Sequence, residues 1–199
     1  MNAVAKNAGQ GMRERLVESA FDLFLRQGFN RTSVSEIVAA ANATKGAFYH
    51  YFSSKDDLLI DAHVEYLGVQ IAVLKQVRAG GAPLDEQLQE VISRMVLGVY
   101  HYPAHVTLFV EERRSIDPVS AKRASGLRDE FQSLFTGIIV EGVESGAFRS
   151  DFDPVTASLG LLGMLTWTFT WTTRRSEKEV RVVADQLARM AVEGLRVHQ

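Results

Sequence analysis

The chain has 199 residues, of which 46% are hydrophobic, and its formal net charge at pH 7 is −2. This apolar content excludes global disorder and suffices for a sizeable core, while the small net charge does not by itself indicate a nucleic-acid-binding protein. The absence of cysteine excludes disulfides, thiolate catalysis and cysteine-bound zinc. Neither a signal peptide nor an apolar run of transmembrane length is present, so we expect a soluble cytoplasmic protein without a membrane partner.

The first 60 residues are slightly more basic than the rest, with seven Lys/Arg against six Asp/Glu. Residues 1–11 are polar and predict a flexible arm. The next segment, "RERLVESAFDLFLRQG", predicts a helix that ends at Gly28. The broad apolar face of this helix consists of Leu16, Ala20, Phe21, Leu23 and Phe24.

Residues 33–59, "SVSEIVAAANATKGAFYHYFSSKDDLL", begin with two short predicted helices. Ser33 and Glu36 form a capping box at the start of the first helix. Asn42 then turns the chain, and Thr44 caps a second helix that ends near Tyr51. Two short helices joined by "AANAT" have the lengths and the turn of a helix-turn-helix.

The pattern within these two helices separates a buried seam from an outward face. The seam consists of Val34, Ile37, Val38, Ala41, Phe48 and Phe52. On the outward face a lysine can neutralise a phosphate, a glycine permits close approach to a sugar-phosphate backbone, and aromatic and histidine side chains can reach phosphates or base edges. The predicted DNA-contacting residues are Ser33, Thr44, Lys45, Gly46, Ala47, Tyr49, His50 and Lys55.

The rest of the chain predicts longer helices. Ser54, with Asp57 three residues later, caps one that runs from Lys55 to about Arg78. After the loop "AGGAP", further helices are predicted at about 84–101, 104–115, 119–145, 154–174 and 177–197; Gly146 is a predicted C-cap, and Ser176 with Glu179 a predicted capping box.

One segment favours two different structures. "LTWTFTWTT" (165–173) alternates apolar residues with threonine, which is typical of a strand. No other segment offers a partner strand, and an unpaired buried strand is costly, so we predict a continuous helix here. In that helix Trp167 and Trp171 share one face, with Met164 beside them.

The ordered pattern "TSVSEIVAAANATKGAFYHYFSSKDDLL", preceded by "LFLRQGFNR", resembles the DNA-binding domain of TetR-family transcriptional regulators over residues 13–60. One departure is Tyr51, at a position where the family often has histidine, while His50 lies one place earlier. The resemblance implies DNA-contacting roles for Lys45, Gly46, Tyr49 and Lys55.

The resemblance also implies a fold and a function for the whole chain. The fold is all-α, with a three-helix helix-turn-helix domain (12–60) joined by a long helix to a helical ligand-binding and dimerisation domain (61–199). The function is that of a repressor that binds a palindromic operator in double-stranded DNA as a homodimer and is released by a small hydrophobic or amphipathic effector. The alternative from another class is a helical protein-interaction module without DNA binding, in which the aromatic residues of the short helices are one corner of a core.

The last two predicted helices are the candidates for the dimer interface. Small residues in "PVTASLGLLGMLTW" allow close helix approach, and "VRVVADQLARMAVEGL" has an apolar stripe. By resemblance, this pair forms the family's four-helix interface, through Leu159, Gly160, Leu162, Gly163, Val183, Leu187, Met190 and Ala191. The alternative is that the same stripes form an intramolecular core.

Residues 61–176 are expected to hold the effector pocket, lined by Phe109, Glu112, Arg113, Phe131, Phe135, Met164, Trp167 and Trp171. The order "HYPAHVTLFVEERR", "GVESGAFRSDFD", "GMLTWTFTW" resembles regulators of fatty-acid, phenylacetate and steroid breakdown. That resemblance implies an acyl-CoA thioester as effector, with basic residues binding the CoA phosphates: Arg113, Arg114, Lys122, Arg123 and Arg128. The alternatives are a solvated helix face for these basic residues, and a drug-like ligand of the kind that efflux regulators sense.

An enzyme is the less favoured interpretation. His101 and His105 have a metal-ligand spacing, but Pro103 between them disrupts the shared helical face, and the general-base glutamate of HExxH is missing. No GxSxG elbow or phosphate-binding loop occurs. We therefore expect no catalytic residue, no metal and no cofactor.

Overall fold

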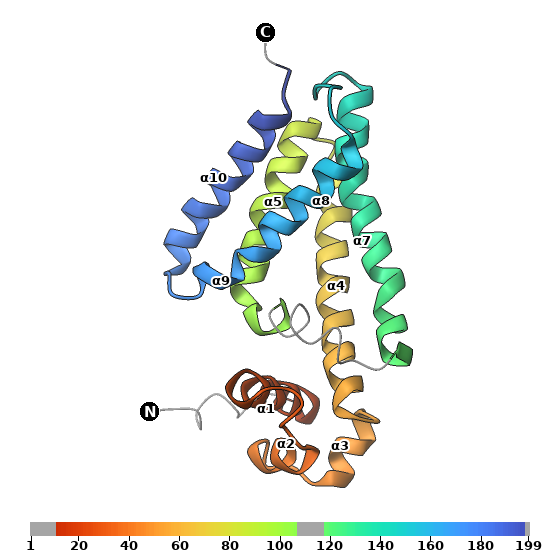
Figure 1. The fold of residues 1–199 in the computed structure, drawn as a ribbon, viewed down its shortest axis with the longest axis vertical. Coiled ribbons are helices and arrows are strands. Elements are labelled where there is room, and N and C mark those ends of the chain that lie inside the picture. Colours follow the sequence, from red (N-terminus) through yellow and green to blue (C-terminus); the bar gives the residue numbers. More distant parts are fainter. Residues whose placement is uncertain (1–10, 107–117, 198–199) are drawn as a thin grey trace. The chain divides into compact units, whose positions relative to one another are not determined.

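The computed structural model describes residues 11–106 and 118–197, and the side chains of 118–121 also lie outside the description. The described residues form α-helices without a named strand, and an isolated bridge joins Phe148 to Arg196 (Figure 1). The described residues divide into two compact units, one formed by 11–65 and 118–124, the other by 66–106 and 125–197. The predicted all-α fold is confirmed. None of the described helices combines the length and the apolar composition that a bilayer span requires.

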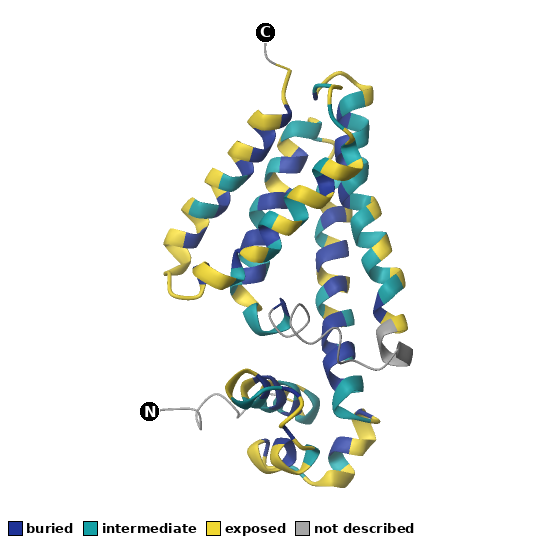
Figure 2. Cartoon of the chain, viewed as in Figure 1, coloured by how far each residue is buried: buried dark blue, intermediate teal, exposed yellow. Residues whose placement is uncertain are grey.

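The first unit contains α1 (Met12–Gln27), α2 (Val34–Ala40), α3 (Lys45–Tyr51) and the first turns of α4 (Lys55–Ala79). Its core is the predicted apolar seam: Ile37, Phe48 and Phe52 are buried against Leu16 and Phe24 of α1. Figure 2 shows this buried face on each short helix, with exposed residues on the opposite side. The helices are therefore amphipathic in the register that the sequence predicts.

Local capping and turn residues set where α2 and α3 begin and where the chain turns between them. Ser33 Oγ accepts a hydrogen bond from the Glu36 amide, and the Glu36 carboxylate accepts one from the Ser33 amide, which confirms the predicted capping box. Thr44 Oγ1 accepts from the Ala47 amide at 3.1 Å and starts α3. Between them Asn42 has a φ of +49°, a left-handed turn conformation that asparagine tolerates.

The second unit contains the rest of α4, α5 (Leu84–His101), most of α7 (Pro118–Glu144), α8 (Pro154–Trp167), α9 (Phe169–Thr172) and α10 (Glu177–Leu195). Helix α5 packs against α8 and α10 around a continuous apolar core. Residues 103–106 are helical, and most of the predicted helix 104–115 lies outside the described residues.

The predicted continuous helix 154–174 is wrong at its middle, because Thr168 interrupts the α-helical hydrogen-bonding pattern between α8 and α9, although its backbone keeps helical dihedrals (φ −59°, ψ −23°). The Thr168 amide bonds to the Leu165 carbonyl, an i−3 pairing, and the Thr168 hydroxyl donates to the same oxygen at 2.7 Å. Threonine hydroxyls that compete for helix carbonyls in this way bend or break helices. The strand-like alternation of threonine thus reflects a helix break.

Candidate DNA-binding site

One face of α3 packs against the rest of the first unit through its buried aromatic residue. Phe48 is fully buried, and its ring contacts those of Phe52 and Tyr49, with centroids 5.6 and 5.4 Å apart. Tyr49 is nevertheless 56% exposed, because its ring lies on the outer side of Phe48. The alternation of buried and exposed aromatics fixes which side chains of α3 face solvent.

The outward face of α3 consists of residues that suit contact with a polyanion. Lys45, Gly46, Tyr49 and His50 are all exposed, and Ala47 is half-buried. Ser33 and Thr44 are also exposed, although their hydroxyls already cap α2 and α3. The structure therefore brings most of the predicted DNA-contacting residues onto one accessible helix.

Gly46 has no packing reason within the protein to be glycine. A Cβ built at this position meets only Thr44 Oγ1, at 3.7 Å, which is an ordinary contact. Glycine within a helix costs about 0.5–1 kcal/mol relative to alanine. A residue that is unfavourable for the helix and unnecessary for its packing fits a surface that another molecule approaches closely.

Lys55, at the start of α4, makes hydrogen bonds within the protein. Its ammonium donates to the carbonyls of Phe29 and Thr32 at 2.7 and 3.1 Å, with a longer contact to Asn30, and lies 4.5 Å from the centre of the Phe29 ring. These bonds occupy the ammonium donors with the loop between α1 and α2. Lys55 therefore holds this loop to the start of α4, and its phosphate contact stays a prediction.

Comparison with known families agrees with this geometry. Residues 16–62 match the family described as "Bacterial regulatory proteins, tetR family", and residues 81–195, more than half of the chain, match "Tetracyclin repressor-like, C-terminal domain". The chain belongs to the TetR family of transcriptional regulators. This membership confirms the prediction of a DNA-binding regulator that is not an enzyme.

Several relatives of this TetR regulator have been named or solved. The HTH-type transcriptional repressor KstR2 of Rhodococcus jostii is 26% identical over 93% of this chain and 91% of its own. The fatty acid metabolism regulator protein of Bacillus subtilis is 24% identical over 91% of this chain and 94% of its own. The structure of KstR2 of Mycobacterium tuberculosis is similar in fold, with a TM-score of 0.84 at 21% identity over 96% of this chain and 99% of that one.

The predicted dimer residues lie on α8 and α10 of the TetR regulator, in its second unit. Leu159 and Met190 are 50% and 57% exposed, although both are large and apolar. Gly160 and Gly163 have no atom within 4 Å of a built Cβ. Leu162, Val183 and Leu187 are half-buried and Ala191 is buried; of these, Leu162, Leu187 and Ala191 belong to the internal core or pack against it.

A shallow groove runs between these two helices. It is lined by Ala157, Gly160, Leu161, Met164, Met190, Ala191, Gly194 and Leu195. Three predicted dimer residues and Met164, a predicted effector residue, thus line one groove. The lining of this groove is made of apolar and small residues.

Of the predicted effector residues that the structure describes, Phe131, Phe135 and Met164 lie in or against one apolar core, whereas the two tryptophans are exposed. Phe109, Glu112 and Arg113 lie outside the described residues. Phe135 is fully buried in the core of the second unit, and Phe131 packs against that core. Trp167 and Trp171, which were predicted to share one helix face, lie on α8 and α9, on either side of Thr168, and are 61% and 39% exposed.

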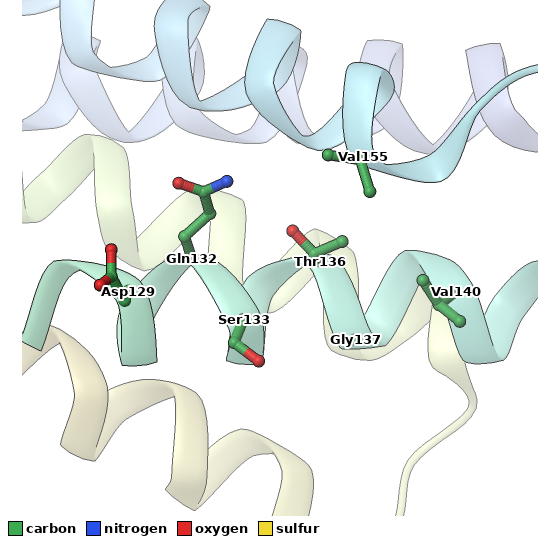
Figure 3. Close-up of a pocket in the computed structure, with 7 residues that line it drawn as sticks. All are labelled: Asp129, Gln132, Ser133, Thr136, Gly137, Val140 and Val155. Carbon is green, nitrogen blue, oxygen red and sulfur yellow. The ribbon is translucent and has the colours of Figure 1, made fainter. Parts of the chain in front are cut away.

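A second shallow cleft lies between α7 and α8. It is lined by Asp129, Gln132, Ser133, Thr136, Gly137, Val140 and Val155 (Figure 3). Beside it, Thr136 Oγ1 and Ser158 Oγ are 2.7 Å apart and join the two helices. Among the described residues, no group of three or more histidine, aspartate or glutamate side chains could hold a metal.

Sequence reasoning missed a polar cluster inside the second unit. Gln70 of α4 is only 6% exposed, and its amide lies against Gly98 of α5, where a Cβ would be 2.7 Å from Nε2. One turn earlier, burial raises the pKa of the Tyr66 hydroxyl, and the Tyr66 ring stacks on His105. A glutamine on a helix carries no sequence signal of burial, so these residues could not be singled out beforehand.

Proposed function

We propose that this TetR regulator is a repressor that binds a palindromic operator as a homodimer and is released by an amphipathic acyl effector. The observation that carries the proposal is the exposed face of α3, in which Lys45, Gly46 and Tyr49 are accessible and Gly46 serves no internal packing. A recognition helix of this kind enters the major groove with its N-terminal residues toward the bases.

Dimerisation follows from how little DNA one such helix can read. Two recognition helices on one side of the duplex must be spaced by about 34–36 Å, which requires a fixed pair of subunits. The exposed apolar residues of α8, Val155, Leu159 and Trp167, recur every four or eight residues on one side of that helix. Together with Met190 of α10 they offer the self-complementary apolar surface that a twofold interface uses.

The effector class is supported by the relatives. Their printed names include a fatty acid metabolism regulator, and a structure of FadR from Bacillus subtilis in complex with stearoyl-CoA has a TM-score of 0.75 at 21% identity, covering 93% of this chain and 99% of that one. In the second unit the buried Gln70 and the half-buried Tyr66 are polar groups in a largely apolar region, a combination that suits an amphipathic ligand.

DNA binding is tested by fluorescence anisotropy with duplexes selected from random sequence by the full-length protein. Lys45→Ala should weaken binding and reduce the slope of log K against log salt by about 1, because one phosphate contact is lost. Lys178→Ala, which removes an exposed lysine from α10, is the matched control and should change neither. An unaltered affinity and slope for Lys45→Ala would favour a helical interaction module instead.

Gly46→Ala adds a second arm to this test. Alanine should leave or raise the melting temperature, since the helix gains propensity, yet lower operator affinity, since the added methyl group faces the duplex. Gly68→Ala, in open space on α4, should raise the melting temperature without changing affinity.

The effector class is tested by adding stearoyl-CoA or a drug-like cation to the operator complex. Release of the DNA by the cation alone would refute the acyl assignment.

A further inference from the structure

The turn that follows α3 is held by a carboxylate of α4. Asp57 Oδ2 accepts hydrogen bonds from the Ser53 amide at 2.8 Å and from the Ser53 hydroxyl at 3.0 Å. Ser54 Oγ in turn accepts from the Asp57 amide at 3.0 Å, as the predicted cap. The Asp57 side chain therefore holds the backbone just after α3.

The other oxygen of the same carboxylate binds a residue far along the chain. Arg123, near the start of α7 and 66 residues after Asp57, donates from Nη1 to Asp57 Oδ1. Its Nη2 donates to Asp61 Oδ1 at 3.1 Å. Because Asp57 and Asp61 are one turn apart on α4, the guanidinium spans two carboxylates on one side of that helix.

A second arginine extends this network to α1. Arg13 Nη2 donates to Asp61 Oδ2 at 2.6 Å, and its Nη1 donates to Glu65 at 3.0 Å. The Arg13 guanidinium also lies 5.8 Å from the centre of the Phe52 ring, at the end of α3. Asp61 is thus shared between arginines of α1 and α7, so three helices of the first unit meet through alternating charges.

The charge state of the network is consistent with this arrangement. Partial burial opposes ionisation of Asp57, but the hydrogen bonds from Ser53 and the charge of Arg123 outweigh it, so the pKa of Asp57 lies below its ordinary value. The carboxylate that holds the turn is therefore ionised at neutral pH and attracts the arginine.

We propose that Arg123 is a positioning residue for DNA binding: through Asp57 and Ser53, α7 holds the turn after α3 in the orientation that the operator requires. This inference rests on the proposed function and names a means of its regulation. Helix α7 continues from Arg123 into the second unit, where Phe131 and Phe135 follow within about 12 and 18 Å along the axis. An effector that displaces α7 loosens the Asp57–Arg123 pair and with it the turn.

An exposed ion pair that only adds stability would behave differently. The Arg123 side chain is 49% exposed, and pairs of that kind contribute little to the free energy of unfolding. Loss of Arg123 should therefore leave the melting temperature nearly unchanged while altering the turn and the affinity for DNA. Separation of these two effects distinguishes positioning from general stabilisation.

The test compares Arg123→Ala and Arg123→Lys in the full-length protein. Operator affinity should fall about 3- to 30-fold for Arg123→Ala, the range typical of residues that couple sites without touching ligand. Its salt slope should stay unchanged, and amide hydrogen exchange in peptides that cover residues 49–58 should accelerate. Lysine should restore part of both, since it keeps the charge but not the two-carboxylate geometry. The matched control is Arg181→Ala, which removes an exposed ion pair with Glu177 on α10.

Asp57→Asn tests the same ion pair from the side of the carboxylate. The asparagine oxygen can still accept from Ser53, but the attraction for Arg123 is lost. The double variant with Arg123→Ala should bind the operator no more weakly than either single variant, because both break the same pair. Strictly additive losses, or wild-type affinity and exchange for Arg123→Ala, would overturn the inference.

Two further outcomes separate the inference from the function on which it rests. A lower salt slope for Arg123→Ala would mean that Arg123 itself contacts phosphate, and would overturn a positioning role. If the wild-type protein selects no DNA, the proposed function fails. The exchange experiment still decides the inference in that case: acceleration over residues 49–58 supports the link from α7 to the turn, and unchanged exchange refutes it.

Discussion

The end of α7 offers a stability prediction whose size can be worked out from geometry. Gly142 is buried in the last turns of α7, and Gly146, with a φ of +77°, reverses the chain just after the helix. The Phe148 amide then bonds to the Gly142 carbonyl at 2.9 Å. As a result the Phe148 ring, which is 1% exposed, lies directly on the α-carbon of Gly142.

Gly142→Ala places a methyl group where that ring is. A Cβ built at Gly142 is 2.0 Å from Cδ2 and 2.4 Å from Cε2 of Phe148, whereas carbon atoms in contact prefer about 3.5–4.0 Å. The ring cannot easily withdraw, because the Arg149 amide is bonded to the Leu195 carbonyl at 2.8 Å and ties the segment to α10. Overpacking of this degree costs about 3 kcal/mol, at the upper end of the usual range.

Alanine in a helix returns only part of this cost, roughly 0.5–1 kcal/mol. The free energy of unfolding should therefore fall by about 2 kcal/mol, and the melting temperature by about 4–8 °C for a chain of this size. Thermal unfolding followed by circular dichroism measures the shift.

The control is Gly68→Ala on α4, where a built Cβ meets nothing within 4 Å. It should raise the melting temperature by about 1–3 °C through helix propensity alone. Phe148→Leu in the Gly142→Ala background should recover part of the loss, since the smaller side chain makes room for the methyl group. If Gly142→Ala melts at or above the wild-type temperature, the packing argument is refuted.

Three further predictions concern the helix caps, the dimer interface and Lys55. Hydrogen bonds from Ser33, Thr156 and Ser176 lower the pKa of Glu36, Asp153 and Glu179. Because each pKa is lower in the folded than in the unfolded chain, the contribution of these carboxylates to folding stability is present above the ordinary carboxyl pKa and is lost as pH falls through the lowered values. The urea midpoint of unfolding should therefore drop between about pH 5 and 3. A midpoint that is constant over this range would contradict the assignment. Met190→Glu should shift the sedimentation coefficient from dimer to monomer, whereas Lys178→Glu on the same helix should not; dimers in both variants would exclude this part of α10 from the interface. Lys55→Ala should lower the melting temperature and operator affinity without changing the salt slope, and a slope lower by about 1 would restore its role as a phosphate contact.

The short helices could be predicted because their signals are local. Ser33 with Glu36 and the hydroxyl of Thr44 act within three residues of themselves, and Asn42 adopts its turn conformation without help from distant segments. The same holds for Ser176 and the start of α10. Where the side chain that accepts a hydrogen bond from a backbone amide lies within one helical turn of it, both partners can be recognised in the sequence.

The sequence could not decide the outcome where one residue type has several uses. A lysine at the start of α4 suits a phosphate and a set of loop carbonyls equally well, and the choice depends on where residues 29–32 pass. Likewise the threonines at 168, 170 and 172 favour a strand by propensity, but each hydroxyl donates to a helix carbonyl at 2.7–2.8 Å. Propensity describes the residue alone, whereas these outcomes depend on which acceptor is within reach.

Helix α4 shows most clearly what a one-dimensional pattern omits. Asp57, Asp61 and Glu65 recur every four residues, a spacing that by itself is typical of a solvated acidic stripe. In the folded first unit these carboxylates instead receive Arg13 from α1 and Arg123 from α7, at separations of 48 to 66 residues. Because Asp61 binds both arginines, a change at either end of the network alters the partner available at the other. An acidic stripe on a connecting helix can therefore transmit position between helices, provided that its partners come from elements that themselves move or bind.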